Sequence, residues 1–85
     1  MKMSKLTIYG SLLCPDTQEA LKLLDKKQIE YDFKNISDEL VNLKAFLAIR
    51  DTNDKFNAVR EKGGIGIPCF VLKNGELSFD VNDVL

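Results

Sequence analysis

A strand, a helix and a second strand follow one another within the first 36 residues, and this order constrains the fold more than any other feature. Residues 6–9 combine apolar, β-branched and aromatic side chains, which predicts a buried strand. An amphipathic helix is predicted over residues 15–27, and alternating apolar and polar residues predict a strand over residues 31–36. Such a βαβ unit requires two parallel strands joined by a right-handed crossover.

Two further helices are expected after this unit. Ser37 has the chemistry of an N-cap, and Ile36 and Val41 are spaced to form a hydrophobic staple across the helix start. This helix should end near Arg50, and a shorter helix is predicted over residues 54–62. The side chains expected on the buried face of the longer helix are Leu40, Leu43, Phe46 and Leu47.

The last part of the chain predicts an antiparallel hairpin. Strands are expected over residues 67–72 and 77–79, and the Asn74-Gly75 pair between them is the strongest short-range signal for a hairpin turn. Residues 80–85 predict a short or truncated C-terminal helix. Together with the βαβ unit, the hairpin predicts an α/β fold: a mixed four-stranded sheet flanked by helices, in a single domain over residues 1–85.

Composition excludes several classes of function. The 85 residues are 45% hydrophobic and 29% charged with a net charge of −1, and no block of like charge predicts binding to nucleic acid or lipid. No segment has the apolar length of a signal peptide or membrane span, so we expect a cytoplasmic protein without nucleic-acid or membrane partners. The chain has no histidine, which excludes a histidine general base. It also excludes most zinc sites, so we expect no bound metal.

Cys14 lies at the joint between the first strand and the first helix. It is the expected N-cap, and Pro15 is at the first helical position, where a missing N–H is not needed. The positive end of a helix favours the thiolate, the reactive form of cysteine. Position 17, where a dithiol protein would have its second cysteine, is Thr17, whose hydroxyl is expected to donate to the thiolate. The alternative for Cys14 is a small buried hydrophobe.

The chain resembles the glutaredoxins of the thioredoxin-fold superfamily over nearly its whole length. Two motifs carry the resemblance, in the order that the family has them: Cys14-Pro15 at a helix start and Ile67-Pro68 at a strand start. The resemblance implies a thioredoxin-like fold and a cis Pro68 that faces the Cys14 loop. It also implies a monomeric thiol–disulfide oxidoreductase. Its nucleophile would be Cys14, with Pro15 and Thr17 completing the catalytic loop. Because Thr17 is no cysteine, the mechanism would be monothiol, with glutathione as co-substrate and glutathione or protein disulfides as partners.

The same resemblance implies a glutathione-binding surface. The backbone of Ile67 would pair with the glutathione backbone as an added strand. Phe79 and Asp80 align with the glycine pair that the family uses to hold the glutamyl end, and Asn82 retains suitable polar chemistry there. The residues that the resemblance assigns to this surface are Ser11, Asp16, Ile67, Pro68 and Asn82.

Several interpretations stay open on sequence alone. Cys69, next to Pro68, is either a resolving thiol for Cys14 or a core cysteine between Pro68 and Phe70. The chain as a whole is either an oxidoreductase or a non-catalytic binding module of the same fold. A third interpretation is a glutathione-dependent iron–sulfur carrier that uses Cys14 of each subunit in a dimer.

Overall fold

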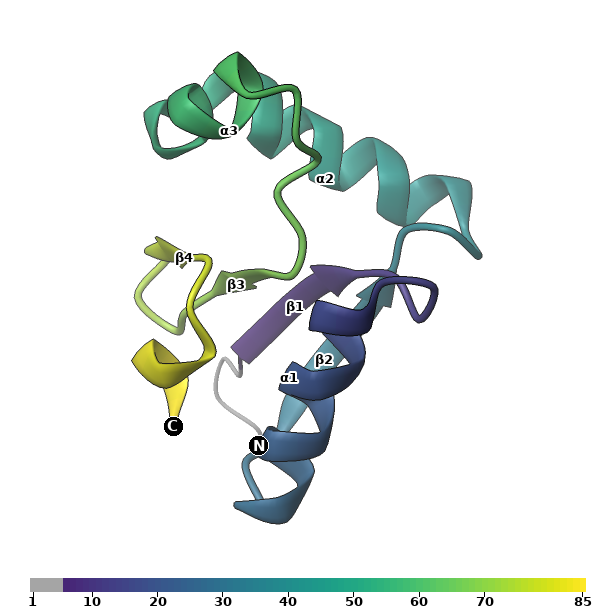
Figure 1. The fold of residues 1–85 in the computed structure, drawn as a ribbon, viewed down its shortest axis with the longest axis vertical. Coiled ribbons are helices and arrows are strands. Elements are labelled where there is room, and N and C mark those ends of the chain that lie inside the picture. The colour runs from purple at the N-terminus through teal and green to yellow at the C-terminus, as the bar shows by residue number, and fades with distance from the viewer. Residues whose placement is uncertain (1–5) are drawn as a thin grey trace.

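The computed structural model describes residues 6–85, which form a mixed four-stranded sheet (Figure 1). The strands are β1 (Leu6–Gly10), β2 (Tyr31–Asn35), β3 (Cys69–Val71) and β4 (Leu77–Ser78), in the order β2-β1-β3-β4. β1 pairs in parallel with β2 and antiparallel with β3, which pairs antiparallel with β4. The predicted βαβ unit, hairpin and mixed four-stranded sheet are therefore confirmed.

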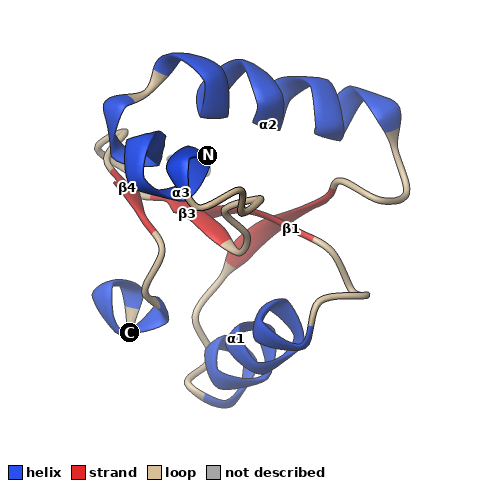
Figure 2. Cartoon of the chain, turned by 45° about the horizontal axis from the view of Figure 1, so that its top comes forward, coloured by secondary structure: helices blue, strands red, loops and turns tan. Residues whose placement is uncertain are grey.

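Helices cover both faces of this sheet (Figure 2). Helix α1 (Pro15–Lys26) and the C-terminal 3-10 turn η2 (Val81–Val84) lie on one face, and α2 (Leu40–Thr52) and α3 (Asn57–Glu61) lie on the other. A 3-10 turn, η1 (Asp54–Phe56), runs directly into α3, so the predicted second short helix is two joined elements. Within the described part of the chain, no helix is long and apolar enough to cross a membrane.

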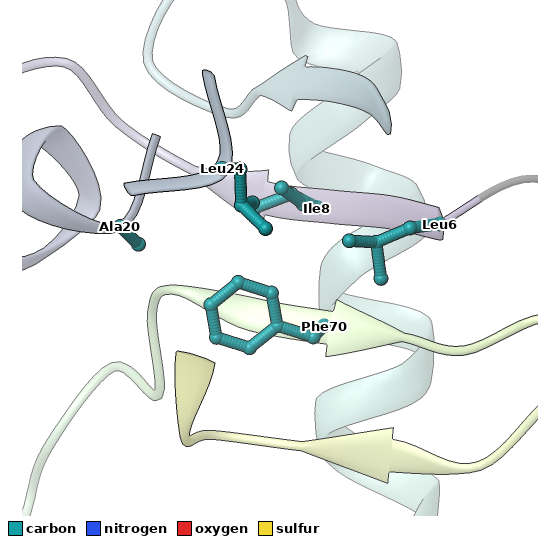
Figure 3. Close-up of a cluster of buried hydrophobic side chains, with 5 residues drawn as sticks. All are labelled: Leu6, Ile8, Ala20, Leu24 and Phe70. Carbon is teal, nitrogen blue, oxygen red and sulfur yellow. The ribbon is translucent and has the colours of Figure 1, made fainter. Parts of the chain in front are cut away.

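The core on the α1 face consists of side chains from β1, β3 and α1 (Figure 3). Ile8 and Phe70 are directly paired across β1 and β3 and are fully buried. Helix α1 covers them with Ala20 and Leu24, which are four residues apart and therefore share one face of the helix. Their burial confirms the amphipathic helix predicted over residues 15–27 and fixes its orientation against the sheet.

A second core lies on the α2 and α3 face. It contains Phe46 of α2, Phe56 of η1, Cys69 of β3 and Leu77 of β4. Because successive side chains of a strand point to opposite faces, Cys69 enters this core while its neighbour Phe70 enters the other.

The predicted start of α2 is wrong. Glu39, not Ser37, is the N-cap, so Asp38 and Glu39 precede the helix. The Ser37 hydroxyl instead donates to Asn35 Oδ1 at 2.8 Å, which keeps residues 36–38 in a turn. Val41 is exposed, so the structure does not form the Ile36–Val41 staple.

The predicted buried face of α2 is only partly correct. Phe46 is fully buried, whereas Leu40 and Leu47 are 64% and 38% exposed. The half-buried apolar neighbours of Phe46 are Leu43 and Ile49, at spacings of three residues on either side. Since each residue turns a helix by about 100°, Leu47 lies about a quarter turn away from Phe46 and Leu40 lies on the outer side.

Candidate functional site

Cys14 is the N-cap of α1, as its sequence position predicts. Its backbone is extended (φ −99°, ψ 120°) and Pro15 follows at the start of the helix. Cys14 N donates to Ser11 O at 3.0 Å, and Gln18 N donates to Cys14 O at 3.1 Å, which is the first turn of α1. The side chain is partly exposed and forms no disulfide. Cys14 is therefore a partly exposed residue at the end of a helix whose first N–H groups have no partners within the helix.

A chain of hydroxyl hydrogen bonds fixes the loop before Cys14. The Ser37 hydroxyl donates to Asn35 Oδ1, so the Ser11 hydroxyl, 2.8 Å away, donates to Ser37 Oγ. Ser11 Oγ also accepts from Leu13 N at 3.1 Å. Ser11 is 7% exposed, and these bonds anchor the loop that leads to Cys14; its predicted contact with a ligand stays a prediction.

Thr17 is directed toward the sheet. It is fully buried, and an ideal Cβ on Gly10 would lie 2.8 Å from both Thr17 Oγ1 and Thr17 Cγ2. Thr17 Oγ1 has no hydrogen-bond partner within residues 6–85, so the expected donation from this hydroxyl to Cys14 is not formed. Turning the side chain toward β1 allows α1 to approach the strand closely at glycine, and this packing takes the hydroxyl away from the thiol.

The Ile67–Pro68 peptide bond is cis, as the resemblance implies. The segment leading to it is held by Arg50 of α2, whose Nε donates to Ile65 O at 3.0 Å and whose Nη2 donates to Gly64 O at 2.6 Å. Arg60 in turn donates to Arg50 O, which links α3 to the end of α2. Sequence reasoning missed both arginines, because their partners are backbone carbonyls distant in sequence.

An open groove of 1160 Å³ begins beside the first turn of α1. Its lining includes three residues of the predicted ligand surface, Asp16, Ile67 and Pro68. Asn82 is exposed and lies outside the lining, although its neighbours Val81 and Asp83 belong to it. The volume exceeds the ~300–1,000 Å³ of most small-molecule pockets.

The hairpin, η1 and α3 also contribute residues to the lining of the groove. Phe79 lines it and packs edge-on against Phe56, with ring centroids 4.9 Å apart. Lys55 also lines it, and its Nζ donates to Leu77 O at 2.9 Å. The groove lining thus contains an aromatic ring and a cation as well as the carboxylate of Asp16. The sequence provides no local signal for Lys55, because only the folded chain brings η1 against β4.

Cys69 differs from Cys14 in both position and reactivity. It is fully buried between Phe46, Phe56 and Leu77 and is not bonded to Cys14. Burial raises the pKa of the Cys69 thiol from 9.0 to about 11. A thiol with this pKa is almost entirely protonated near neutral pH and is a poor nucleophile. The position of Cys69 is that of a core residue, one of the two interpretations that its sequence position allows.

Comparison with known proteins identifies one informative relative. The chain is 35% identical over 80 residues to an uncharacterized protein of Haemophilus influenzae, and the alignment covers 94% of this chain and 93% of that protein. No protein-family model matches the chain, and no solved structure matches it.

Proposed function

We propose that the chain, which belongs to the same family as this Haemophilus influenzae protein, is a monothiol thiol–disulfide oxidoreductase of the glutaredoxin type with a thioredoxin-like fold. The single observation that carries the proposal is the partly exposed Cys14 at the N-terminus of α1, a helix whose first turn lines the groove that contains the cis Ile67–Pro68 bond. Asp16, two residues after Cys14, lines the same groove as Pro68. A substrate bound along Pro68 would thus meet the end of α1 that bears the thiol.

The proposed reaction has two exchange steps. The Cys14 thiolate attacks one sulfur of a disulfide, a new S–S bond forms, and the other half of the substrate leaves as a thiolate. The N–H groups in the first turn of α1 stabilise the attacking charge. A second thiol, glutathione in this proposal, then attacks the mixed disulfide and releases Cys14. The buried Cys69, with its raised pKa, leaves this second step to an external thiol.

The groove supports a peptide-like co-substrate. Ile67 and Pro68 line it at the start of β3, whose paired residues begin at Cys69. An extended peptide could add to the free edge before this pairing begins, which is recognition by strand addition. We further propose that the protein acts in the cytoplasm, where disulfides formed on Cys14 would be reduced again.

Intact-mass measurement tests the proposal directly. Reduced protein is incubated with oxidised glutathione, alongside the Cys14→Ser and Cys69→Ser variants. We expect one glutathionyl group on the wild-type protein and on Cys69→Ser, and none on Cys14→Ser. A two-hydrogen loss without an adduct would indicate a Cys14–Cys69 bond and would contradict the monothiol mechanism.

A non-catalytic binding module is the second candidate, and the position of Thr17 favours it. The buried Thr17 hydroxyl leaves the thiol without the side-chain donor expected at this position. Under this alternative, the groove binds a partner and Cys14 does not exchange. An unchanged mass in the glutathione experiment, together with slow alkylation of Cys14, would support it.

A further inference from the structure

Ser37 lies in the turn after β2, yet its hydroxyl contacts the loop that leads to Cys14. Ser37 Oγ lies 2.8 Å from Ser11 Oγ, although the two serines are 26 positions apart in the sequence. The last residues of the parallel strands β1 and β2, Gly10 and Asn35, are paired, so the loops after them begin side by side. One loop leads to α1 on one face of the sheet, and the other leads to α2 on the opposite face (Figure 2). The contact between the two serines therefore joins the Cys14 loop to the turn before α2.

The hydrogen bonds of this contact have one direction. Asn35 Oδ1 accepts from Ser37 N at 3.0 Å and from the Ser37 hydroxyl at 2.8 Å. Because a hydroxyl has a single proton, Ser37 Oγ accepts the proton of Ser11, and Ser11 Oγ in turn accepts from Leu13 N at 3.1 Å. The chain of hydrogen bonds thus runs from Leu13 N through both hydroxyls to Asn35. Removal of the Ser37 hydroxyl would break this chain in the middle.

The sheet fixes the far end of the chain of hydrogen bonds. Asn35 belongs to β2, which pairs with β1, and β1 also pairs with β3, which begins directly after Pro68. The Ser37 hydroxyl therefore ties the Cys14 loop to the same sheet that positions the cis bond before Pro68. Without this tie, the thiol and the cis bond would be held less firmly relative to each other.

Other hydrogen bonds of the loop are local. Cys14 N donates to Ser11 O at 3.0 Å, and the Gln18 side chain of α1 donates to Leu12 O. These bonds fix the loop relative to α1, whereas the Ser37 hydroxyl fixes it relative to the sheet. The two sets of bonds therefore have different roles, and the role of Ser37 can be tested separately.

We propose that Ser37 is a positioning residue for Cys14, and that its hydroxyl acts through Ser11 to hold the thiol where a disulfide bound along Pro68 meets it. The inference rests on the proposed function, since it concerns the exchange reaction of that site. Misplacement of a reacting group by about 1 Å can slow a reaction about 100-fold. Alkylation of the same thiol by a small reagent requires no bound substrate. Loss of the Ser37 hydroxyl should therefore slow disulfide exchange more than alkylation.

Threonine and valine at position 37 test the inference as a matched pair. The two side chains have nearly the same shape, and only threonine has a hydroxyl. Ser37 is exposed and its φ is not positive, so its position is compatible with a β-branched residue.

Intact mass follows two reactions of Cys14 in the reduced wild-type protein, Ser37→Thr and Ser37→Val. Oxidised glutathione transfers one glutathionyl group to the Cys14 sulfur and releases glutathione thiolate. Iodoacetamide transfers a carbamidomethyl group to the same sulfur and releases iodide. We expect exchange with oxidised glutathione to be about threefold to tenfold slower in Ser37→Val, the effect of one hydrogen bond, and nearly unchanged in Ser37→Thr. Iodoacetamide should react with all three proteins at nearly equal rates.

A Ser11→Ala background tests whether Ser37 acts through Ser11. Alanine at position 11 removes the hydroxyl that joins Ser37 to Leu13 N. Ser37→Val should then have no further effect on the exchange rate, which is the non-additivity expected of two residues in one network. A full additional effect would mean that Ser37 acts by another route and would overturn the inference.

Failure of the inference and failure of the proposed function give different results. If oxidised glutathione does not modify Cys14 in the wild-type protein, the exchange reaction is absent and both are overturned. If it does, and Ser37→Val reacts at the wild-type rate or both variants react equally slowly, the oxidoreductase stands and the role of the Ser37 hydroxyl is overturned. Equal slowing of exchange and alkylation in Ser37→Val would also overturn it, because the general reactivity of the thiol, and not its position, would then depend on Ser37.

Discussion

Adding one methyl group at Gly10 should destabilise the folded protein. An ideal Cβ there would lie 2.8 Å from Thr17 Oγ1 and Cγ2, closer than van der Waals contact allows. We expect Gly10→Ala to lower the free energy of unfolding by about 1–3 kcal/mol, the usual cost of overpacking a core. Urea unfolding followed by circular dichroism measures this loss.

The Thr17→Ala background isolates the cause of that loss. Alanine at position 17 removes both atoms that would clash with the new methyl group. Gly10→Ala should then cost about 1 kcal/mol less than in the wild-type protein, which is the coupling expected of residues in contact. Additive losses in the double variant would show that strain in β1, and not the contact with Thr17, destabilises Gly10→Ala.

Cys69 predicts a loss of stability at alkaline pH. Its pKa is raised from 9.0 to about 11 by burial, so the folded state keeps the proton over a range in which the unfolded state releases it. The stabilising effect of the protonated thiol is therefore complete below about pH 9 and is lost as pH rises toward about pH 11. The full difference is on the order of 2 kcal/mol.

A Cys69→Ala variant separates this effect from the titration of other groups. Lysines and tyrosines titrate in both proteins, so the wild-type protein should lose more unfolding free energy than the variant between about pH 8 and about pH 10.5. The unfolding free energy is measured by urea titration at the two pH values. If the wild-type protein and Cys69→Ala lose the same amount, the Cys69 thiol has the same pKa in the folded and unfolded states, which would contradict the prediction.

At the scale of single residues, the position of a residue within its element could be predicted from the sequence more reliably than the direction of its side chain. The position of Cys14 as N-cap follows from the sequence, because Pro15 and the helix pattern after it mark the start of α1, whereas the cis bond before Pro68 follows from the resemblance alone. The orientation of Thr17 depends on its contact with Gly10, and that of Ser11 depends on Ser37, 26 residues away. Such contacts exist only in the folded chain.

At the scale of elements, the sequence predicted order and type better than boundaries. Pro15 marks the start of α1 because its ring is compatible only with the first turn. Ser37 resembled an N-cap equally well, yet its hydroxyl bonds to Asn35 and Ser11, so α2 begins at Leu40. A side chain with several possible partners gives an ambiguous signal until the loops beside it are placed.

Arg50 connects α2 to the segment that precedes the cis Ile67–Pro68 bond, and this contact can be tested by substitution. Its guanidinium donates to Ile65 O and Gly64 O together, an arrangement that the single ammonium of lysine cannot reproduce. We expect Arg50→Lys to lower the free energy of unfolding by about 1–2 kcal/mol. Amide hydrogen exchange in residues 63–66 should rise more than in β1.

Lys44→Ala is the matched control for this prediction. Lys44 is exposed on the same helix, so removing its ammonium tests for a general effect of charge on α2. We expect little change in unfolding free energy or in exchange at residues 63–66. If Arg50→Lys loosens all strands equally, the arginine stabilises the whole fold and has no particular role before Pro68.

On the scale of the whole molecule, the groove is assembled from segments distant in sequence. The groove is lined by Asp16 of α1, Lys55 of η1 and Phe79 after β4, although the first and the last are 63 positions apart in the sequence. The sequence predicted the wall that contains Asp16, Ile67 and Pro68, because the resemblance is carried by residues at or beside these positions. It did not predict Lys55 or Lys62, because surface lysines carry no local pattern that identifies a role.

Phe56 connects the groove to the core beneath it. It is fully buried, its ring centroid lies 5.8 Å from that of Phe46 and 4.9 Å from that of Phe79, and its Cε1 would lie 2.7 Å from a Cβ at Gly66. Phe46 belongs to the core, whereas Phe79 and Gly66 both line the groove. A change at Phe56 should therefore alter stability and groove shape together.

We expect Phe56→Leu to lower the free energy of unfolding by about 1–3 kcal/mol and to slow the modification of Cys14 by oxidised glutathione severalfold. Leu24→Ala is the control, because Leu24 is fully buried in the other core and lies about 15 Å along α1 from Cys14. It should destabilise the protein by about 2–5 kcal/mol and leave the rate unchanged in the folded protein. If both variants react equally slowly, the rate of Cys14 modification follows overall stability and not groove shape. If neither rate changes, Phe79 and Gly66 keep their positions without the Phe56 ring.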